Sequence, residues 1–440
     1  MQRLRFIHAA DLHLDSPFKG MTELPPQLRE QVRESTFEAL RQLVALAIRE
    51  QVDFVLIGGD VYDLADRSLR AQLRFQKAVQ QLADHNIPTY IIHGNHDPED
   101  GRAARLTWPA AVHFFACDQV ETIEVEKPGR GVIAHIHGIS YKTAAVTENL
   151  ALQFRALDSA IYQIGLLHTN VDGDAGHDNY APCSKQDLLR RGMHYWALGH
   201  VHTRKVLNDS PAIVYPGNLQ GRSIRETGPR GCYLVNVDED GAAELSFQEL
   251  DCLRWHVVKL SIRDIRTEQE LRSMLEEHMD VIRFAAEGRD SIVRVILEGR
   301  GPVHELLRKG RALAELMADL REEEAARIGG AARGLDLNPL SQAGFVWIES
   351  MEDRSGSEID RALLLQQKSF AGDLLRLSQS LQLDEAALQA FAGEALAALQ
   401  ALPQAAGGPP ALEQERLQQW LHAAEELAAD LLAAGRGWDG

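Results

Sequence analysis

The pattern of apolar positions in the first hundred residues predicts strands and helices in alternation. Short β-rich apolar runs are separated by longer segments in which apolar residues recur every three or four positions. The expected strands cover residues 6–10, 54–57 and 89–93, and the expected helices cover 28–50 and 69–83. This order predicts a sheet of parallel strands with helices packed over its faces.

The pattern changes near residue 110, where short β-like runs follow one another closely. These runs cover residues 120–126, 132–140, 161–168, 195–198, 212–215, 232–237 and 244–250. We therefore expect a second sheet packed on the first, in one domain that covers residues 1–252. The predicted fold class is α/β, with this two-sheet sandwich as the first domain.

Two further regions follow in the sequence. Residues 253–356 read as strand, helix, strand, helix, strand, which predicts a small α+β domain; its long helices are expected at 268–286 and 303–324. Residues 357–440 are rich in Leu, Ala and Gln, and Gly407-Gly408-Pro409-Pro410 reads as a linker between helices. These helices either pack on their own domain or bind a partner protein, and the pattern leaves both alternatives open.

Composition indicates a soluble globular protein of two or three domains. The chain has 440 residues, of which 45% are hydrophobic and 25% charged. No apolar run reaches the roughly 20 residues that a membrane-spanning helix needs, and none resembles a signal peptide. The four cysteines are scattered without a CxxC pair, which fits a reducing cytoplasm better than a disulfide framework.

The net charge of −18 argues against a nucleic-acid partner at first sight. The acidic excess is uneven, however, because residues 351–440 alone hold 14 acidic and 6 basic residues. Carboxylates of a metal site account for another share, and bound cations would offset them locally. The charge therefore weakens a DNA-binding hypothesis without removing it.

Candidate chemistry gathers where five of the predicted strands end. Each of these apolar runs stops at Asp, Asn or His, and active sites of α/β folds lie at such strand ends. The candidate metal ligands, in chain order, are Asp11, His13, Asp60, Asn95, His168, His200 and His202. Oxygen and nitrogen donors of this kind suit Mn²⁺, with Fe or Zn as alternatives.

Spacing adds detail to this candidate site. Asp11 and His13 are two residues apart, as are His200 and His202, so each pair can share one side of an extended segment. Asp60 is the best-placed carboxylate to bridge two cations. The set supplies enough ligands for two divalent metal ions that share one carboxylate.

The order DxH, GDxxD, GNHD, H, GHxH over residues 1–250 resembles the calcineurin-like metallophosphoesterase superfamily. Within it, Asp11-Leu12-His13-Leu14-Asp15-Ser16-Pro17-Phe18 and Pro216-Gly217-Asn218-Leu219-Gln220-Gly221-Arg222 look most like SbcD-type DNA repair exonucleases, and closest to the YhaO branch. The region 253–356 looks like the capping domain of those nucleases. Residues 357–440 take the place where such proteins hold a coiled-coil ATPase.

The resemblance implies roles for individual residues. It assigns one metal to Asp11, His13, Asp60 and His202, and the second to Asp60, Asn95, His168 and His200. It makes His96 the catalytic histidine near the leaving oxygen, with Asp97 orienting it. Asp63 stands where some family nucleases have a histidine, so its role is open between supporting the site from behind and orienting a ligand.

The implied function is a Mn-dependent DNA exonuclease of DNA repair that works in the cytoplasm with an SbcC-like ATPase and without a membrane, and the resemblance allows a homodimer. Arg222 and Arg102 are the expected DNA contacts. The enzyme alternative is a metallophosphoesterase of a small phosphorylated or cyclic-nucleotide substrate, which the acidic charge favours. The other alternative is a scaffold that holds partners, which an intact ligand set argues against.

Overall fold

The computed structural model describes residues 1–440 except 19–23, 64–67, 101–103, 105, 158–159, 175, 177, 309–310, 333–343, 359–360, 401–413 and 435–440. The chain divides into two compact units. The first contains Met1–Val258, Glu277–Arg294 and Met317–Ser350, and the second contains Lys259–Glu276, Val295–Leu316 and Met351–Gly440. Both units draw on residues 253–356, and the predicted three-domain division at 252 and 356 stays a prediction.

The first sheet of the first unit has the strand order β12-β11-β1-β2-β3-β4. Strands β1, β2 and β3 run parallel, as predicted; β4 continues the parallel order, and β11 and β12 extend the sheet with antiparallel pairing. Their bounds are β1 Leu4–Ala9, β2 Phe54–Ile57, β3 Thr89–Ile91, β4 Val112–Phe114, β11 Gly231–Val237 and β12 Ala243–Glu249. Because β1, β2 and β3 are parallel neighbours, their carboxyl ends meet at one edge of the sheet.

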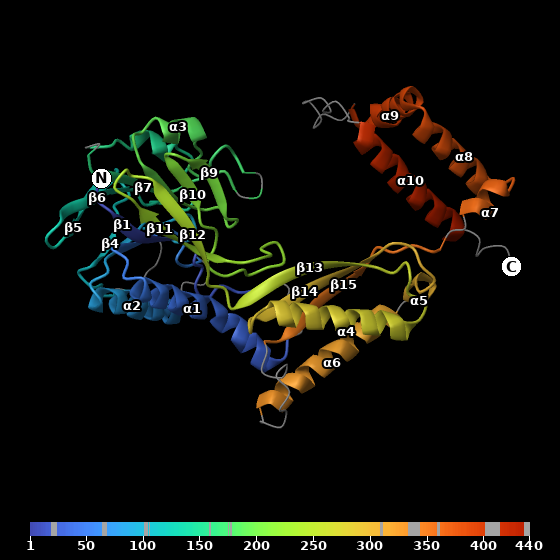
Figure 1. The fold of residues 1–440 in the computed structure, drawn as a ribbon, viewed down its shortest axis with the longest axis horizontal. Coiled ribbons are helices and arrows are strands. Elements are labelled where there is room, and N and C mark those ends of the chain that lie inside the picture. Colours follow the sequence, from blue (N-terminus) through green and yellow to red (C-terminus); the bar gives the residue numbers. More distant parts are fainter. Residues whose placement is uncertain are drawn as a thin grey trace. The chain divides into compact units, whose positions relative to one another are not determined.

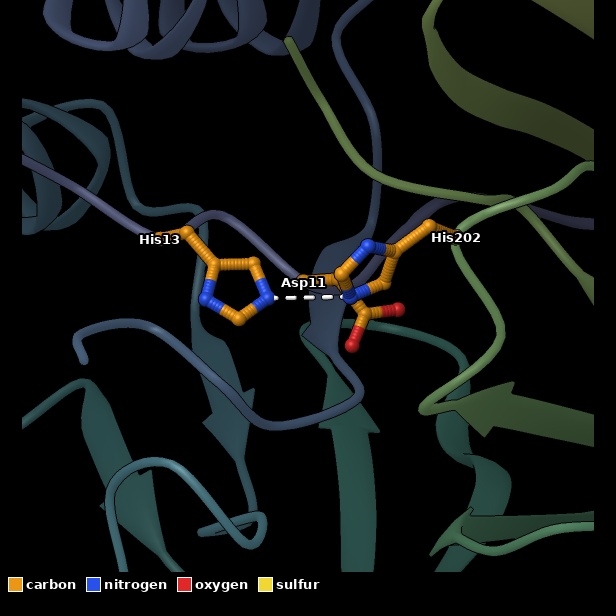
Figure 2. A group of neighbouring side chains, drawn as sticks. All are labelled: Asp11, His13 and His202. Carbon is orange, nitrogen blue, oxygen red and sulfur yellow. Dashed lines mark hydrogen bonds between the residues drawn. The ribbon is translucent and has the colours of Figure 1, made fainter. Parts of the chain in front are cut away.

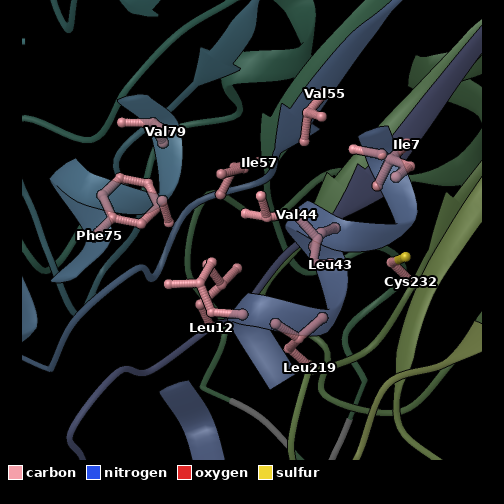
Figure 3. Packing of buried hydrophobic residues seen from close by; sticks show 14 of the residues in the cluster. Ile7, Leu12, Leu43, Val44, Val55, Ile57, Phe75, Val79, Leu219 and Cys232 are labelled. Atoms are coloured by element: carbon pink, nitrogen blue, oxygen red, sulfur yellow. The ribbon is translucent and has the colours of Figure 1, made fainter. Parts of the chain in front are cut away.

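Two helices cover the outer face of this sheet: α1, Pro26–Arg49, and α2, Leu69–Asp84. Figure 3 shows the core between these helices and the sheet, in which Leu43 and Val44 of α1 and Phe75 of α2 pack near Val55 and Ile57 of β2. Both helices lie within one or two residues of their predicted bounds, because their apolar residues follow the helical period closely.

The second sheet has the strand order β5-β6-β7-β8-β10-β9. Its bounds are β5 Glu121–Lys127, β6 Gly131–Gly138, β7 Tyr162–His168, β8 Tyr195–Gly199, β9 Lys205–Asp209 and β10 Ala212–Tyr215. Residues of both sheets form one buried cluster, in which Phe6 and Phe54 stack at 5.1 Å and Tyr195 packs edge-on against Phe6. The predicted two-sheet α/β sandwich is confirmed.

The opposite face of the second sheet is covered by α3, Lys185–Leu189, and a short 3-10 helix at Leu150–Gln153. In Figure 1, α1 and α2 therefore lie on one side of the paired sheets and α3 on the other. The sequence pattern did not predict α3, β4 or β9, because each is too short to show a clear period.

The remaining elements comprise a three-stranded sheet, β13-β14-β15, and further helices. The bounds are β13 Leu253–Ser261, α4 Glu268–Ala285, β14 Asp290–Glu298, α5 His304–Leu307, α6 Ala312–Ala332, β15 Val346–Asp353, α7 Arg361–Gln366, α8 Phe370–Leu383, α9 Glu385–Gln400 and α10 Gln414–Ala434. The single helix predicted over 303–324 is wrong, since two helices stand there and the sequence between them contains the helix-breaking Gly310. The linker predicted at 407–410 lies outside the described residues. Among the described helices, none combines the length and the apolar character needed to cross a membrane.

Gly165 of β7 shows how tightly the second sheet is packed. It lies opposite the buried Trp196 of β8, and a Cβ atom at Gly165 would stand 2.5 Å from the Trp196 ring. We expect Gly165→Ala to lower the free energy of unfolding by about 1–3 kcal/mol, because the ring has to shift within a packed core. Urea denaturation measures this effect. Gly329→Ala in α6, where a Cβ meets nothing within 4 Å, is the control that should keep or raise stability.

Candidate metal centre

Five strand ends bring the predicted ligands to one edge of the sandwich. Asp11 and His13 follow β1, Asp60 follows β2, Asn95 follows β3, and His168 ends β7. His200 and His202 follow β8. Asp11, His13, Asp60, His168 and His200 are buried, whereas Asn95 and His202 are half-buried. The seven side chains therefore face one another rather than solvent.

One group of donors consists of Asp11, His13 and His202. Their ligand atoms lie within 4.8 Å of one another, and the Nε2 atoms of His13 and His202 are 3.1 Å apart. Figure 2 shows these two rings meeting in front of the Asp11 carboxylate. The Oδ2 atom of Asp60 is 3.9 Å from His13 Nε2 and completes this group.

A second group of donors forms around Asn95. The Oδ1 atom of Asn95 is 2.9 Å from His168 Nε2 and 3.1 Å from His200 Nδ1. Asp60 Oδ2 is 3.4 Å from His168 Nε2. The same oxygen of Asp60 thus faces both groups, which is the arrangement that a bridging carboxylate requires.

Each of the four histidines is held from behind through its other ring nitrogen. His13 Nδ1 bonds to Asp63 Oδ1 at 2.8 Å, and His202 Nδ1 bonds to Glu226 Oε1 at 2.7 Å. His168 Nδ1 bonds to the Gly58 carbonyl at 2.8 Å, and His200 Nε2 bonds to a backbone carbonyl at 2.7 Å, that of Asp178. All four partners are acceptors, so the nitrogen that faces them carries the ring proton. The other nitrogen of each ring, which faces the donor groups, then presents a lone pair, as in metal-ligating histidines.

The lone pairs of these ring nitrogens show whether the residues could bind a cation. The Nε2 atoms of His13 and His202 are two acceptors at contact distance, an arrangement that is unfavourable unless a positive charge lies beside them. Nitrogen and oxygen donors without thiolates suit Mn²⁺, Fe or Zn. The donor set therefore fits divalent metal ions.

Electrostatics supports the same conclusion. Burial raises the pKa of Asp11 to about 6, and burial together with Asp97 and Asp11 raises the pKa of Asp60 well above its usual value. Burial also lowers the pKa values of His13 and His168 well below the usual value. Burial therefore disfavours the ionised form of these carboxylates, and divalent cations beside them would favour that form instead.

The backbone at the site adopts conformations that non-glycine residues rarely take. The φ angles are 52° at Asp11, 44° at His13, 51° at Asp60 and 100° at His200. Such conformations cost of order 1–3 kcal/mol each and tend to occur where function requires them. Four of the seven predicted ligands thus lie in the left-handed region of backbone conformation.

His96, Asp97 and Asp63 form the part of the site next to the Asp60 carboxylate. His96 Nδ1 lies 2.7 Å from Asp63 Oδ1, and the His96 backbone N–H donates to Asp60 Oδ1 at 2.8 Å. Asp97 accepts from the backbone N–H groups of Gly94, Asp60 and Val61, so it orders the loops that carry His96 and Asp60. The predicted orienting role of Asp97 stays a prediction, and Asp63 supplies the observed contact to the His96 ring.

Arg222 lies deeper than the sequence suggested. Its Nη1 atom donates to Asp63 Oδ2 at 3.1 Å, and its backbone N–H donates to Glu226 Oε2 at 2.6 Å. Its contact with DNA stays a prediction, and so does that of Arg102, which lies outside the described residues. Glu226 was not identified from the sequence, because it lies in an irregular segment that does not follow a strand end. Its position four residues after Arg222 was the one feature that could have indicated a contact between the two.

A cavity of about 290 Å³ opens over this site. It is lined by Asp60, Asn95, His96, Gly176, Asp178, His200 and His202. His96 is 44% exposed while its Nδ1 is engaged by Asp63. The cavity therefore gives a ligand access to the shared carboxylate, the second donor group and the His96 ring.

Comparisons with known proteins agree with this geometry. A family model described as calcineurin-like phosphoesterase matches residues 4–204, and one described as the middle domain of metallophosphoesterase YhaO matches residues 255–356. The uncharacterized metallophosphoesterase YhaO of Bacillus subtilis is 42% identical over 281 residues, which cover 64% of this chain and 68% of that protein.

Other relatives match at lower identity. The DNA double-strand break repair protein Mre11 of Saccharolobus solfataricus is 27% identical over 54% of this chain and 61% of its own length. The SbcD component of the SbcCD nuclease of Bacillus subtilis is 23% identical over 56% of this chain and 69% of its own. A solved dimetal phosphatase from Danio rerio aligns over 54% of this chain and 93% of its own, with a TM-score of 0.34 and 12% identity.

Proposed function

Because the chain belongs to the calcineurin-like metallophosphoesterase family and carries a YhaO-type middle domain, we propose that it is a two-metal phosphodiester hydrolase acting on DNA as a repair exonuclease. The observation that carries the proposal is the position of Asp60 Oδ2, 3.9 Å from His13 Nε2 and 3.4 Å from His168 Nε2. The names of the Mre11 and SbcCD relatives support DNA as the substrate.

The bound cations, which we propose to be Mn²⁺ with Fe or Zn as alternatives, would polarise the phosphate and the attacking water. Asp11, His13, Asp60 and His202 would hold one, and Asp60, Asn95, His168 and His200 the other. Asp60 also fixes the loop of His96 by accepting its backbone N–H.

His96 is the proposed proton donor to the leaving oxygen. Asp63 holds the ring by Nδ1, which leaves Nε2 for a ligand in the cavity that the ring lines. A proton donated from Nε2 would neutralise the alkoxide that forms when the phosphodiester bond breaks.

Partners are proposed on the same basis. An SbcC-like coiled-coil ATPase would bind the helices after residue 357, where Phe370, Leu377, Leu383, Trp420 and Leu427 expose apolar surface. We also propose a homodimer and a cytoplasmic location, which suits the four unpaired cysteines. Arg222 and Arg102 are the DNA contacts that the family resemblance suggests.

The second candidate function is hydrolysis of a small phosphodiester. It is favoured by the limited volume of the cavity and by the way basic side chains are already paired near it. Lys205, just after His202, bonds to Asp174 in the loop that also supplies Asp178 to the cavity wall. Arg70 and Arg74 both pair with Glu34. Fewer basic side chains are thus left to bind the phosphates of a DNA backbone than the sequence suggests.

His96→Ala distinguishes protonation of the leaving oxygen from the metal-dependent attack on the phosphate. With Mn²⁺, we expect wild-type protein to degrade linear double- or single-stranded DNA, and His96→Ala to be slower by about 10²–10⁴-fold, because the leaving alkoxide loses its proton donor. Hydrolysis of bis-p-nitrophenyl phosphate should fall much less, since p-nitrophenolate leaves without a proton. Metal content should be unchanged.

Two outcomes would redirect the proposal. Full DNA cleavage by His96→Ala would contradict the proton-donor role. Intact DNA together with hydrolysis of bis-p-nitrophenyl phosphate by the wild type would favour the small substrate, unless addition of the candidate ATPase restores DNA cleavage.

A further inference from the structure

Glu226, Arg222 and Asp63 form a continuous chain of contacts behind the metal centre. Glu226 Oε1 accepts from His202 Nδ1, and Glu226 Oε2 accepts from the Arg222 backbone N–H. The Arg222 guanidinium then donates to Asp63 Oδ2. Asp63 Oδ1 lies within hydrogen-bond distance of the Nδ1 atoms of His13 and His96. Two ligand histidines and the proposed proton donor are therefore connected through one arginine.

Asp63 uses both of its oxygens fully. Oδ1 faces two ring nitrogens, at 2.8 Å for His13 and 2.7 Å for His96. Oδ2 accepts from Arg222 Nη1 at 3.1 Å and from the hydroxyl of Ser16. An ionised carboxylate has about four acceptor positions, so its orientation is determined from both ends. If Arg222 released Oδ2, that oxygen would keep only the Ser16 hydroxyl of its two donors, and the carboxylate that holds both rings would be less firmly oriented.

Arg222 is poorly placed to bind a substrate at the same time. Its side chain is 15% exposed, as is that of Asp63. An arginine that turned outward to a phosphate would leave the Asp63 carboxylate without its cationic partner, and removing one partner of a largely buried ion pair is strongly unfavourable. The contacts inside the protein therefore compete with the predicted contact to DNA.

We propose that Arg222 is a positioning residue, which fixes Asp63 and through it His13 and His96, and that it does not bind the substrate. The proposal rests on the phosphodiester hydrolysis proposed above, and it narrows the role of a residue that sequence alone assigned to DNA. Glu226 fixes the same arginine at its backbone and holds His202.

A double-mutant cycle on metal affinity tests this role without using activity. Arg222→Ala and the isosteric Asp63→Asn should each weaken Mn²⁺ binding, measured by calorimetry, within the about 10–100-fold that loss of a supporting contact costs. The double variant should bind about as well as either single variant, because Arg222 acts through Asp63. Losses that multiply in the double variant would overturn the proposal. If Arg222→Ala does not fold, Arg222→Gln, which removes the charge and shortens the side chain less, takes its place in the same cycle with Asp63→Asn.

Activity on two substrates distinguishes positioning from DNA binding. Arg222→Ala should slow bis-p-nitrophenyl phosphate hydrolysis by at least about tenfold through kcat, since its positioning effect does not depend on substrate size. Arg225→Ala, three residues along and exposed, should hydrolyse this substrate like wild type. Wild-type hydrolysis by Arg222→Ala, with a salt slope for DNA binding reduced by about one, would instead identify a phosphate contact. Failure of DNA cleavage alone would leave these results intact and would concern only the proposed substrate.

Discussion

Asp60→Asn is expected to remove metal-dependent hydrolysis altogether and to lower metal content at both positions. Asp60 Oδ2 is the atom common to the two donor groups, and its backbone conformation, at φ 51°, is one that Asn tolerates well. The substitution therefore takes away the bridging charge without disturbing the chain. Metal analysis of the purified variant and its rate with Mn²⁺ on bis-p-nitrophenyl phosphate measure both effects.

Thermal unfolding with and without Mn²⁺ measures metal binding by the same variant independently of activity. Mn²⁺ at 100 times its dissociation constant should stabilise the wild type by about 2.7 kcal/mol, and Asp60→Asn should gain much less. Asp172→Asn is a matched control, because Asp172 also has a positive φ, of 56°, and lies exposed in a loop. A variant at position 60 that binds two metals and hydrolyses substrate at the wild-type rate would contradict the bridging role.

The sequence predicted the frame of this site well for a physical reason. Buried parallel strands read as apolar runs, and most of the polar ligand candidates follow directly where such a run stops. Asp60 and Asn95, 35 positions apart, could be placed at one edge because the strands before them, β2 and β3, were expected to be parallel neighbours. The two-sheet sandwich followed from the same patterns.

What the sequence could not supply was the outer layer of contacts. Glu226 lies in an irregular segment where no period indicates which way a side chain points. The contact between His96 and Asp63 joins positions 33 apart through two loops, so nothing local indicates it. The helix predicted over 303–324 was wrong for the opposite reason, since its apolar spacing continues across a segment where the structure has two separate helices, α5 and α6.

Gly94→Ala should disable the site by crowding it. Gly94 starts the loop after β3, and a Cβ atom there would stand 2.3 Å from Asp60 Oδ1 and 2.7 Å from His168 Cε1. Asp60 and His168 both belong to the second donor group, and Asp60 also holds His96. We expect metal affinity and hydrolysis each to fall by about 10–100-fold, as when a contact that fixes a metal site is lost. Calorimetry with Mn²⁺ and rates on bis-p-nitrophenyl phosphate measure the two quantities.

Gly165→Ala is the informative comparison, because it crowds a ring of the core instead of a ligand. Both substitutions would force a neighbouring side chain to move, because the new Cβ atom would be 2.3 Å from Asp60 Oδ1 at position 94 and 2.5 Å from the Trp196 ring at position 165. If crowding acted only through stability, the two variants would lose metal binding in proportion to their loss of unfolding free energy. We expect Gly94→Ala to lose metal binding while remaining folded, and Gly165→Ala to lose stability while still binding Mn²⁺. The opposite pairing would show that Gly94 is there for packing, and that the carboxylate and imidazole beside it can shift without cost to the metal centre.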